Sequence, residues 1–265
     1  KLQEKKKDTD DVYNSEDDGI EEHKNKLTQK QLNAEQKRKE RESLKQDTYS
    51  HFETTREIDV IPNFVQVCQE PRIVDTEKRC KYASDAEVLL CHVSNFRPVK
   101  RIQDVIQVFH RVQLQIPAKL ILAGDGPDRV LAERLSRELC IQNKIIFVGK
   151  VRETGPILSI CDLFLLPSET ESFGLAALEA MAEGVPVISS NTGGIPEVNK
   201  HGFSGYTSNV GDVEDMAKNA LKILRDKETL AQFKSNAIVR AKHFELVNIL
   251  PYYEQLYERV LKEIV

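Results

Sequence analysis

The chain has 265 residues, which is enough to bury a substantial core in one large domain or two small ones. Its formal net charge of -4 excludes the strongly basic surface of a typical nucleic-acid binder, so no nucleic-acid partner is expected. The sequence shows no apolar run long enough to span a bilayer and no signal peptide. We therefore expect a cytoplasmic protein without a membrane span.

The cysteines and histidines do not form a pattern typical of metal ligands. The five cysteines are Cys68, Cys80, Cys91, Cys140 and Cys161. They are odd in number and include no Cys-x-x-Cys pair, so we expect all of them to be reduced and structural. His92 lies within an apolar segment, which favours a satisfied core residue, and the other histidines do not cluster with carboxylates or cysteines. No metal site is predicted.

The first 42 residues differ from the rest of the chain. More than half of them are Lys, Arg, Asp or Glu, and large apolar residues are few. Such a segment cannot bury enough apolar surface to offset the entropy lost on ordering. Residues 1–42 are therefore interpreted as a charged extension, disordered or forming a solvated helix towards its end. A partner-binding coiled coil is the alternative.

A globular domain is predicted from residue 43 to residue 265. Residues 43–49 resemble a short capped helix, residues 58–61 a strand, and residues 66–85 a loop without clear periodicity. Thereafter apolar strands alternate with amphipathic helices. The strands are expected at 88–93, 119–123, 145–148, 163–166 and 185–189. The helices are expected at 100–115, 127–139, 154–159 and up to residue 182, with three more after residue 212.

Continuous apolar strands that alternate with helices predict an α/β fold, a doubly wound parallel sheet with right-handed crossovers. We expect this Rossmann-like sheet to be followed by C-terminal helices. In such sheets, ligands bind beyond the carboxyl ends of the strands. Polar residues and glycines are concentrated in the loops expected at that edge, as a binding site requires.

Three cations follow the first predicted strand of the alternating region, namely Arg97, Lys100 and Arg101. Cations at this edge can neutralise a pyrophosphate leaving group. The alternative is that these side chains are ordinary solvated cations on the surface, and we favour this alternative for Arg101.

Two carboxylates, Glu171 and Glu179, flank the predicted start of the helix that ends at residue 182. Eight helical residues rise roughly 12 Å, which exceeds the separation of about 5 to 9.5 Å needed by a hydrolytic carboxylate pair. This spacing suits a grip on two ends of one elongated ligand. Between them lie the N–H donors of a helix start, an anion site, on Ser172, Phe173, Gly174 and Leu175. A nucleotide-sugar matches this description, whereas each carboxylate alone could be an ordinary helix residue.

Two glycine turns have open interpretations. Residues 124–127, Gly-Asp-Gly-Pro, lack the third glycine of a dinucleotide-binding turn, so a tight strand-to-helix turn is favoured and a dehydrogenase is not. In the segment 192–197, Thr-Gly-Gly-Ile-Pro-Glu, the glycines allow either close backbone packing or ligand contact.

The segment from Glu171 to Glu179 resembles the E-x7-E signature of the retaining glycosyltransferases of family 4. Residues 166–182 and 184–188 are similar to the same family. The segments 94–101, 61–64 and 193–198 resemble, more narrowly, the branch that transfers N-acetylglucosamine from UDP-N-acetylglucosamine to L-malate in bacillithiol biosynthesis. The resemblance implies the donor-binding half of a two-lobed GT-B enzyme.

The resemblance also implies roles for single residues. Lys100 and Arg97 would hold the donor diphosphate, Glu171 the sugar hydroxyls and Glu179 the ribose. The pyrophosphate would meet the backbone after Ser172, at Phe173, Gly174 and Leu175, and the uracil pocket would be lined by Gly149 and Lys150. Asn95 stands where the wider family usually has Arg, so the guanidinium must come from Arg97. Sugar transfer with retention and without a metal is implied, the departing phosphate helping to deprotonate the acceptor.

Nothing before Ser43 resembles the acceptor-binding lobe of the family. We therefore expect the chain alone to turn over poorly, or not at all, unless a separate chain supplies that lobe. The chain could also form a homo-oligomer. A non-catalytic nucleotide-sugar-binding or interaction module with the same fold is the alternative. A glycogen- or sucrose-type transferase would differ only in substrate.

Overall fold

The computed structural model of the protein describes residues 45–46, 48–52, 58–67 and 75–264. The predicted extension over 1–42, the start of the helix expected at 43–49, and Cys68 lie outside these ranges. The chain divides into two compact units, residues 1–60 and residues 61–265. In the first unit residues 48–51 are helical, and the Ile58 N–H donates to the Tyr49 hydroxyl at 3.1 Å. The strand expected at 58–61 is wrong, because these residues pair with no strand among those described.

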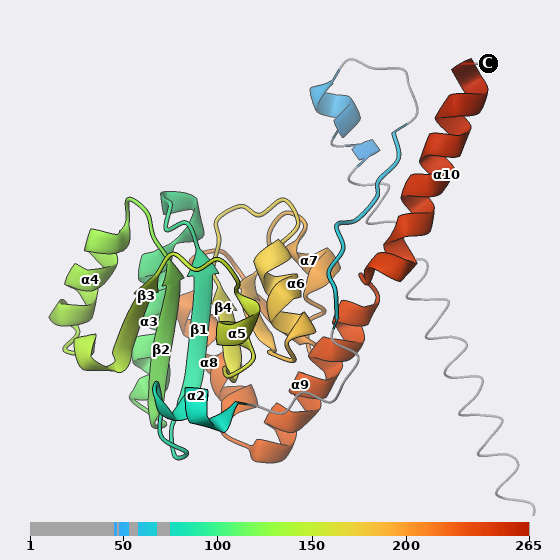
Figure 1. The fold of residues 1–265 in the computed structure, drawn as a ribbon. Helices are drawn as coiled ribbons and strands as arrows, with labels where there is room; N and C mark the ends of the chain where they lie inside the picture. Colours follow the sequence, from blue (N-terminus) through green and yellow to red (C-terminus); the bar gives the residue numbers. More distant parts are fainter. Residues whose placement is uncertain (1–44, 47, 53–57, 68–74, 265) are drawn as a thin grey trace, which may run out of the picture. The chain divides into compact units, whose positions relative to one another are not determined.

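The second unit contains one six-stranded sheet in which every strand runs parallel to its neighbours, in the order β3-β2-β1-β4-β5-β6 (Figure 1). The strands are β1 (Val88–Ser94), β2 (Ala118–Gly124), β3 (Ile145–Gly149), β4 (Leu163–Leu166), β5 (Val187–Ser190) and β6 (Gly205–Ser208). Their apolar sequences are continuous because both faces of the sheet are covered. The predicted doubly wound sheet is confirmed, with β6 as an additional strand.

Helices cover both faces of this sheet (Figure 1). One core lies against α3 (Ile102–Gln113), α4 (Arg129–Glu138) and α8 (Val213–Leu224). The other core lies against α5 (Gly155–Leu158), α6 (Leu175–Ala182), α7 (Ile195–Val198) and part of α9 (Lys227–Lys242). Successive residues of β1 enter different cores, Leu89 one and Leu90 the other, as alternation along a strand requires.

Several element boundaries differ from those predicted. The loop expected at 66–85 contains the short helix α2 (Thr76–Cys80), whose first turn is capped by Asp75. Residues 98–100 form the 3-10 turn η1 (Pro98–Lys100), so α3 begins at Ile102. Pro127 lies in a turn before α4, not at its first position. A second 3-10 turn, η2 (Gln142–Lys144), precedes β3.

A buried carboxylate ties α2 to the sheet and to α9. Asp162 is 6% exposed, and its oxygens lie 2.7 Å from both the Arg79 guanidinium and the Lys234 ammonium. It also accepts the Leu89 N–H at 2.9 Å. Burial opposes ionisation of Asp162, but the two cations and the hydrogen bonds outweigh it and lower its pKa. Removal of the carboxylate would leave two cations without their partner.

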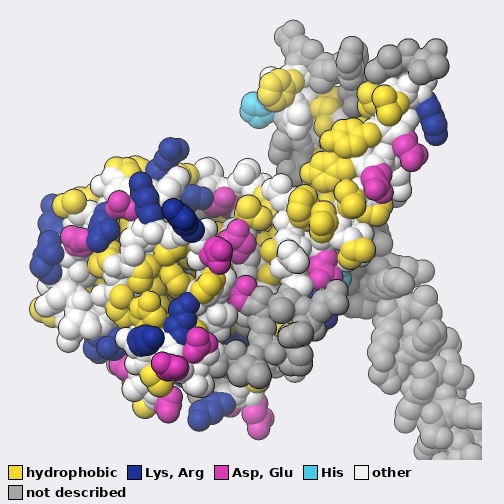
Figure 2. Space-filling model, viewed as in Figure 1, with side chains coloured by type: hydrophobic (Ala, Val, Ile, Leu, Met, Phe, Trp, Pro, Cys, Tyr) yellow, Lys and Arg dark blue, Asp and Glu magenta, His cyan; other side chains and the backbone are white. Residues whose placement is uncertain are grey.

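The C-terminal helix α10 (Leu246–Ile264) carries exposed apolar side chains, which Figure 2 shows as yellow patches along it. They include Leu246, Val247, Leu250, Tyr252, Tyr257, Val260 and Leu261. No helix among the described residues combines the length and apolar character that crossing a membrane requires.

The strand order places the point where the winding reverses between β1 and β4. From β1 the chain continues to β2 and β3 on one side, and β4, β5 and β6 follow on the other. The loops that follow β1 and β4 therefore meet above this point. They carry Lys100 and Glu171, respectively.

Candidate functional site

Lys100 and Glu171 come together at the carboxyl edge of the sheet. The Lys100 Nζ atom lies 2.5 Å from the Glu171 Oε2 atom, and both side chains are largely buried. The Ser168 hydroxyl donates to the same oxygen at 3.2 Å, and the Glu169 N–H donates to the Val99 carbonyl at 2.8 Å. The loops after β1 and β4 are thus joined by both side-chain and backbone contacts.

The loop after β1 is held by one buried aromatic residue and two glycines. Phe96 is fully buried and has a φ of 42°, which is unusual for a residue with a side chain. A Cβ on Gly124 would lie 1.7 Å from the Ser94 carbonyl oxygen, and one on Gly126 would lie 1.9 Å from that of Asn95. The turn at 124–127 therefore packs directly on the loop, as the tight-turn interpretation predicted.

The other polar side chains of this loop point in different directions. Asn95 and Arg97 are exposed, and Arg97 makes no ion pair with any described residue. Arg101 pairs with Asp104 at 2.6 Å, and its guanidinium lies near Gly211. Of the three cations, Arg97 is therefore outside any described ion pair, Lys100 pairs with Glu171, and Arg101 pairs with Asp104 instead. Figure 2 shows Lys and Arg side chains gathered over this end of the sheet.

The start of α6 presents backbone donors. Gly174, at φ 91°, precedes the helix, and the buried Phe173 packs edge-to-face against Phe244. In the described part of the chain, the N–H groups of residues 172–175 donate to no protein acceptor. Glu171 lies four residues before the helix, so the predicted helical rise between Glu171 and Glu179 was wrong over its first half. Donors at a helix start attract anions.

The second glycine turn supports this loop by close packing. A Cβ on Gly193 would lie 2.0 Å from the Glu171 carbonyl oxygen, and one on Gly194 would lie 2.2 Å from that of Ser172. The Gly194 N–H donates to the Glu171 carbonyl at 2.9 Å. The Thr192 hydroxyl donates to the Glu169 carbonyl at 3.1 Å. Of the two interpretations left open, backbone packing is the one that these contacts support.

Glu179 lies on α6 and faces the loop after β3. It is half-buried, and its Oε2 atom accepts a hydrogen bond from the Thr154 hydroxyl at 2.9 Å. In the same loop, Gly149 has a φ of 72° with open space beside it, and Lys150 is exposed. Thr154 has no sequence signal of its own, because nothing before folding indicates that it lies beside a residue 25 positions away.

His92 is a fully buried residue with two polar partners. Its Nδ1 atom lies 2.8 Å from the Leu165 carbonyl oxygen and its Nε2 atom 2.8 Å from the Ser94 hydroxyl. Burial and the nearby Lys100 charge lower its pKa to about 4, although the Leu165 bond opposes this shift. The predicted satisfied core histidine is confirmed. The described cysteines, Cys80, Cys91, Cys140 and Cys161, are free thiols, as predicted.

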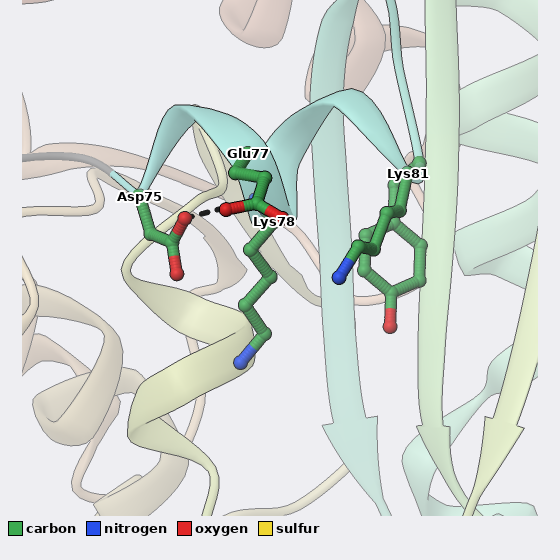
Figure 3. Close-up of a pocket in the computed structure, with 5 residues that line it drawn as sticks. Asp75, Glu77, Lys78 and Lys81 are labelled. Carbon is green, nitrogen blue, oxygen red and sulfur yellow. Dashed lines mark hydrogen bonds between the residues drawn. The ribbon is translucent and has the colours of Figure 1, made fainter.

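A hollow of about 300 Å³ lies beside α2 (Figure 3). It is lined by Asp75, Glu77, Lys78, Lys81 and Tyr82. Because α2 lies where the strands begin (Figure 1), this hollow is at the opposite end of the sheet from the loops described above. Among the residues that the structure describes, no three His, Cys, Asp or Glu side chains cluster in a way that could hold a metal ion.

The strand order and the loops at the switch point define a Rossmann-like α/β domain. The sequence pattern of the family described as Glycosyl transferases group 1 matches residues 74–240, and the chain belongs to this family. It is 38% identical over 223 residues to the N-acetyl-alpha-D-glucosaminyl L-malate synthase of Bacillus anthracis, covering 83% of this chain and 58% of that enzyme. The predicted family and fold are confirmed.

Solved structures share the fold. S. aureus TarM, in complex with fondaparinux, alpha-GlcNAc-glycerol and UDP, has a TM-score of 0.71 at 23% identity over 82% of this chain and 42% of TarM. Anabaena HepE, in complex with UDP-glucose, has a TM-score of 0.59 at 27% identity over 66% of this chain and 49% of HepE. The chain thus spans about half the length of these relatives.

Proposed function

We propose that this chain is the donor-binding lobe of a retaining glycosyltransferase that transfers N-acetylglucosamine from UDP-N-acetylglucosamine to L-malate. The single observation that carries the proposal is the meeting of Lys100 and Glu171 beside the unpaired N–H groups of residues 172–175. A cation and a helix start suit a diphosphate, and the adjacent carboxylate suits sugar hydroxyls. The choice of donor and acceptor rests on the name of the Bacillus anthracis relative.

In this proposal the diphosphate lies between the Lys100 ammonium and the start of α6, with Arg97 reaching it from the exposed side of the loop. Glu171 leaves Lys100 and binds the sugar hydroxyls. Glu179, on the side of the loop after β3, binds the ribose, with Gly149 and Lys150 beside the uracil. Asn95 lies at the edge of the same loop as Arg97.

The proposed chemistry depends on stabilising the leaving group. The bond between the sugar C1 and the diphosphate oxygen breaks, and the acceptor hydroxyl oxygen bonds to C1 on the same face. The hydroxyl proton passes to the departing phosphate oxygen. Lys100, Arg97 and the α6 N–H groups stabilise the charge that develops there, and this proposal assigns no step to a metal. The domain orients the donor, and the acceptor is bound by a second lobe.

The free thiols of the described cysteines suit a reducing compartment, so the proposed site of action is the cytoplasm. Because the described domain carries only the donor loops, we expect it to bind UDP-N-acetylglucosamine weakly and to transfer sugar poorly by itself. The acceptor would be bound by a second lobe.

Calorimetric titration with UDP-N-acetylglucosamine tests the proposal directly, since donor binding needs no acceptor. The unmodified chain should bind the donor, and Lys100→Ala and Glu179→Gln should each weaken binding about tenfold or more, the cost of a lost charged hydrogen bond. Lys119→Ala, at the opposite end of β2, and Glu214→Gln, an exposed partner of Arg111, are matched controls that should bind normally.

A panel of UDP-glucose and ADP-glucose distinguishes the donor from those of glycogen- and sucrose-type enzymes. Addition of an acceptor lobe and L-malate should then give labelled transfer product. Absence of heat with every nucleotide-sugar would contradict the proposal and favour an interaction module. Normal turnover by the isolated chain would contradict its dependence on a second lobe.

A further inference from the structure

His92 lies on β1 beside β4, where the winding of the sheet reverses, and no step of the proposed chemistry uses it. In the backbone pairing of β1 with β4, Leu90 pairs with Leu163 and Cys91 pairs with Phe164. At the next position along both strands, the His92 side chain bonds to the Leu165 carbonyl instead. The imidazole therefore joins the two strands where their loops begin to separate. Those are the loops that carry Lys100 and Glu171.

The hydrogen bonds of this imidazole have a fixed direction. A carbonyl oxygen can only accept, so Nδ1 carries the proton in the bond to Leu165. Nε2 of a neutral imidazole is then an acceptor, and the Ser94 hydroxyl donates a hydrogen bond to it. The Ser94 oxygen in turn accepts the Phe96 N–H at 3.2 Å. The series of bonds runs from the loop backbone through Ser94 and His92 to β4.

The last of these bonds acts on an unusual backbone conformation. Phe96 is held at a φ of 42°, where residues with side chains are uncommon. Its ring is stacked on the imidazole with the ring centroids 6.2 Å apart, and Phe164 lies at the same distance on β4. A purely space-filling residue could pack between two aromatic rings, but it could not bind the Leu165 carbonyl and the Ser94 hydroxyl together. The polar pair therefore fixes a turn of the loop as well as filling the core.

We propose that His92 and Ser94 are positioning residues that set the backbone of residues 95–100, and hence Arg97 and Lys100, relative to Glu171 on the neighbouring loop. This inference rests on the proposed donor site, because it assigns the two residues a role in forming that site. Their effect on the donor is exerted through Arg97 and Lys100. Neither touches the donor in this proposal.

Three single variants and one double variant test this role. Ser94→Ala removes the hydroxyl and keeps the imidazole bond to Leu165. His92→Asn keeps a donor near the Nδ1 position and loses the contact with Ser94. Cys91→Ala is the matched control, since Cys91 is a fully buried neighbour on the same strand whose truncation removes packing and one weak thiol contact with the Leu163 carbonyl at 3.6 Å. Each variant is examined for thermal unfolding and for UDP affinity by calorimetry at a temperature where it is folded.

The expected result is that Ser94→Ala and His92→Asn each weaken UDP binding about five- to tenfold, the effect of one lost hydrogen bond. Because both residues act in one series of hydrogen bonds, the variant that combines His92→Asn and Ser94→Ala should bind UDP at most about twofold more weakly than the single variant with the lower UDP affinity. Cys91→Ala should lower the melting temperature and leave the UDP affinity within about twofold, since cavity costs fall on stability.

Nitrogen-15 NMR of the histidine ring gives a readout that does not depend on any variant folding. The unmodified protein should show His92 as the neutral tautomer with its proton on Nδ1. A proton on Nε2 would overturn the inference, because Ser94 could not then donate to it.

The two proposals fail in different ways. Loss of UDP affinity in Lys100→Ala together with full affinity in Ser94→Ala would overturn the positioning role and leave the donor site intact. Equal losses in Cys91→Ala and Ser94→Ala would also overturn it, since any core damage would then suffice. If the unmodified chain does not bind UDP at all, the donor site and the positioning role fall together.

Discussion

The Lys100 ammonium and the Glu171 carboxylate form an ion pair of 2.5 Å between residues 71 positions apart in the sequence. Each of the two groups thereby neutralises the other in the free domain. A bound diphosphate would compete with Glu171 for Lys100, and sugar hydroxyls would compete with Lys100 for Glu171. Donor binding is therefore expected to exchange one internal ion pair for two contacts with the ligand.

This exchange gives a prediction for Glu171→Gln. The amide keeps the size of the side chain but removes the charge that competes with phosphate for Lys100. UDP alone should bind about two- to fivefold more tightly, because an electrostatic competitor is lost. The advantage of UDP-N-acetylglucosamine over UDP should shrink, because a sugar contact is lost. Calorimetry with both ligands measures the two effects.

Glu169→Gln is the control for this prediction, since Glu169 lies on the same loop with an exposed side chain. Its affinities for UDP and UDP-N-acetylglucosamine should match those of the unmodified chain. A loss of UDP affinity in Glu171→Gln as large as that in Lys100→Ala would contradict the competition.

Glu179 gives a prediction about the ribose. If its carboxylate binds the ribose hydroxyls, Glu179→Gln should weaken UDP binding about tenfold and leave binding of 2′-deoxy-UDP nearly unchanged. Thr154→Val removes the hydroxyl that donates to Glu179 and should shift UDP affinity in the same direction by a smaller factor. Titrations with both nucleotides measure this, with the exposed Glu228→Gln as control. Equal weakening for both nucleotides would place Glu179 away from the ribose.

The glycine at 194 gives a prediction about loop support. Its φ of -81° is accessible to any residue, so alanine would not strain the backbone here. Gly194→Ala would instead destabilise the loop, because the new Cβ would lie 2.2 Å from the Ser172 carbonyl oxygen. We expect a loss of about 1 to 3 kcal/mol in the free energy of unfolding, as in overpacked sites. A fall in UDP affinity should accompany it, because residues 171–173 must move.

Gly202→Ala is the complementary control. Gly202 has a φ of 72° with open space around its Cβ position, so the substitution strains the backbone without displacing the loop. It should lower stability and leave UDP affinity unchanged. Donor affinity that follows stability equally in both variants would contradict a specific role for the 193–194 turn.

The alternating pattern of the sequence was sufficient to predict the sheet and the edge that carries the candidate site. Segments such as residues 120–123 are apolar throughout because the middle of the strand is buried on both faces, and this property is visible locally. The five-residue helix α2 was missed because its stability depends on Arg79 meeting Asp162, 83 positions away. The strand expected at 58–61 failed for the converse reason, since apolar residues form a strand only beside a partner strand.

The candidate site shows the same division. Lys100, Glu171 and Glu179 were identified from motif and spacing, because those features lie within single segments. The contacts that hold them were not visible in the sequence. Thr154 meets Glu179, and Gly193 meets the backbone of Glu171, only after distant loops are brought to one edge of the sheet.

The buried imidazole of His92 makes the stability of the domain depend on pH. Burial, together with Lys100, lowers its pKa to about 4, whereas an unfolded histidine titrates near 6.5. The unfolded state therefore binds the proton more readily, and the stabilising contribution of neutral His92 is complete above about pH 6.5 and is lost as the pH falls towards 4. The full difference corresponds to roughly 3 kcal/mol. The pKa of Asp162 is also lowered, so its contribution to stability is lost only when the pH falls below the pKa of an ordinary carboxylate. That loss occurs at lower pH than the loss caused by His92.

Urea unfolding at about pH 7.0, 5.5 and 4.5 measures how the free energy of unfolding changes across this pH range. The free energy of unfolding should fall over this range, and the fall should be distinctly smaller in His92→Asn, which has no imidazole to protonate. His110→Asn, on α3, is the control and should retain the slope of the unmodified protein. If His92→Asn and the unmodified protein lose stability equally as the pH falls, protonation of the buried His92 imidazole is excluded as the cause of the pH dependence.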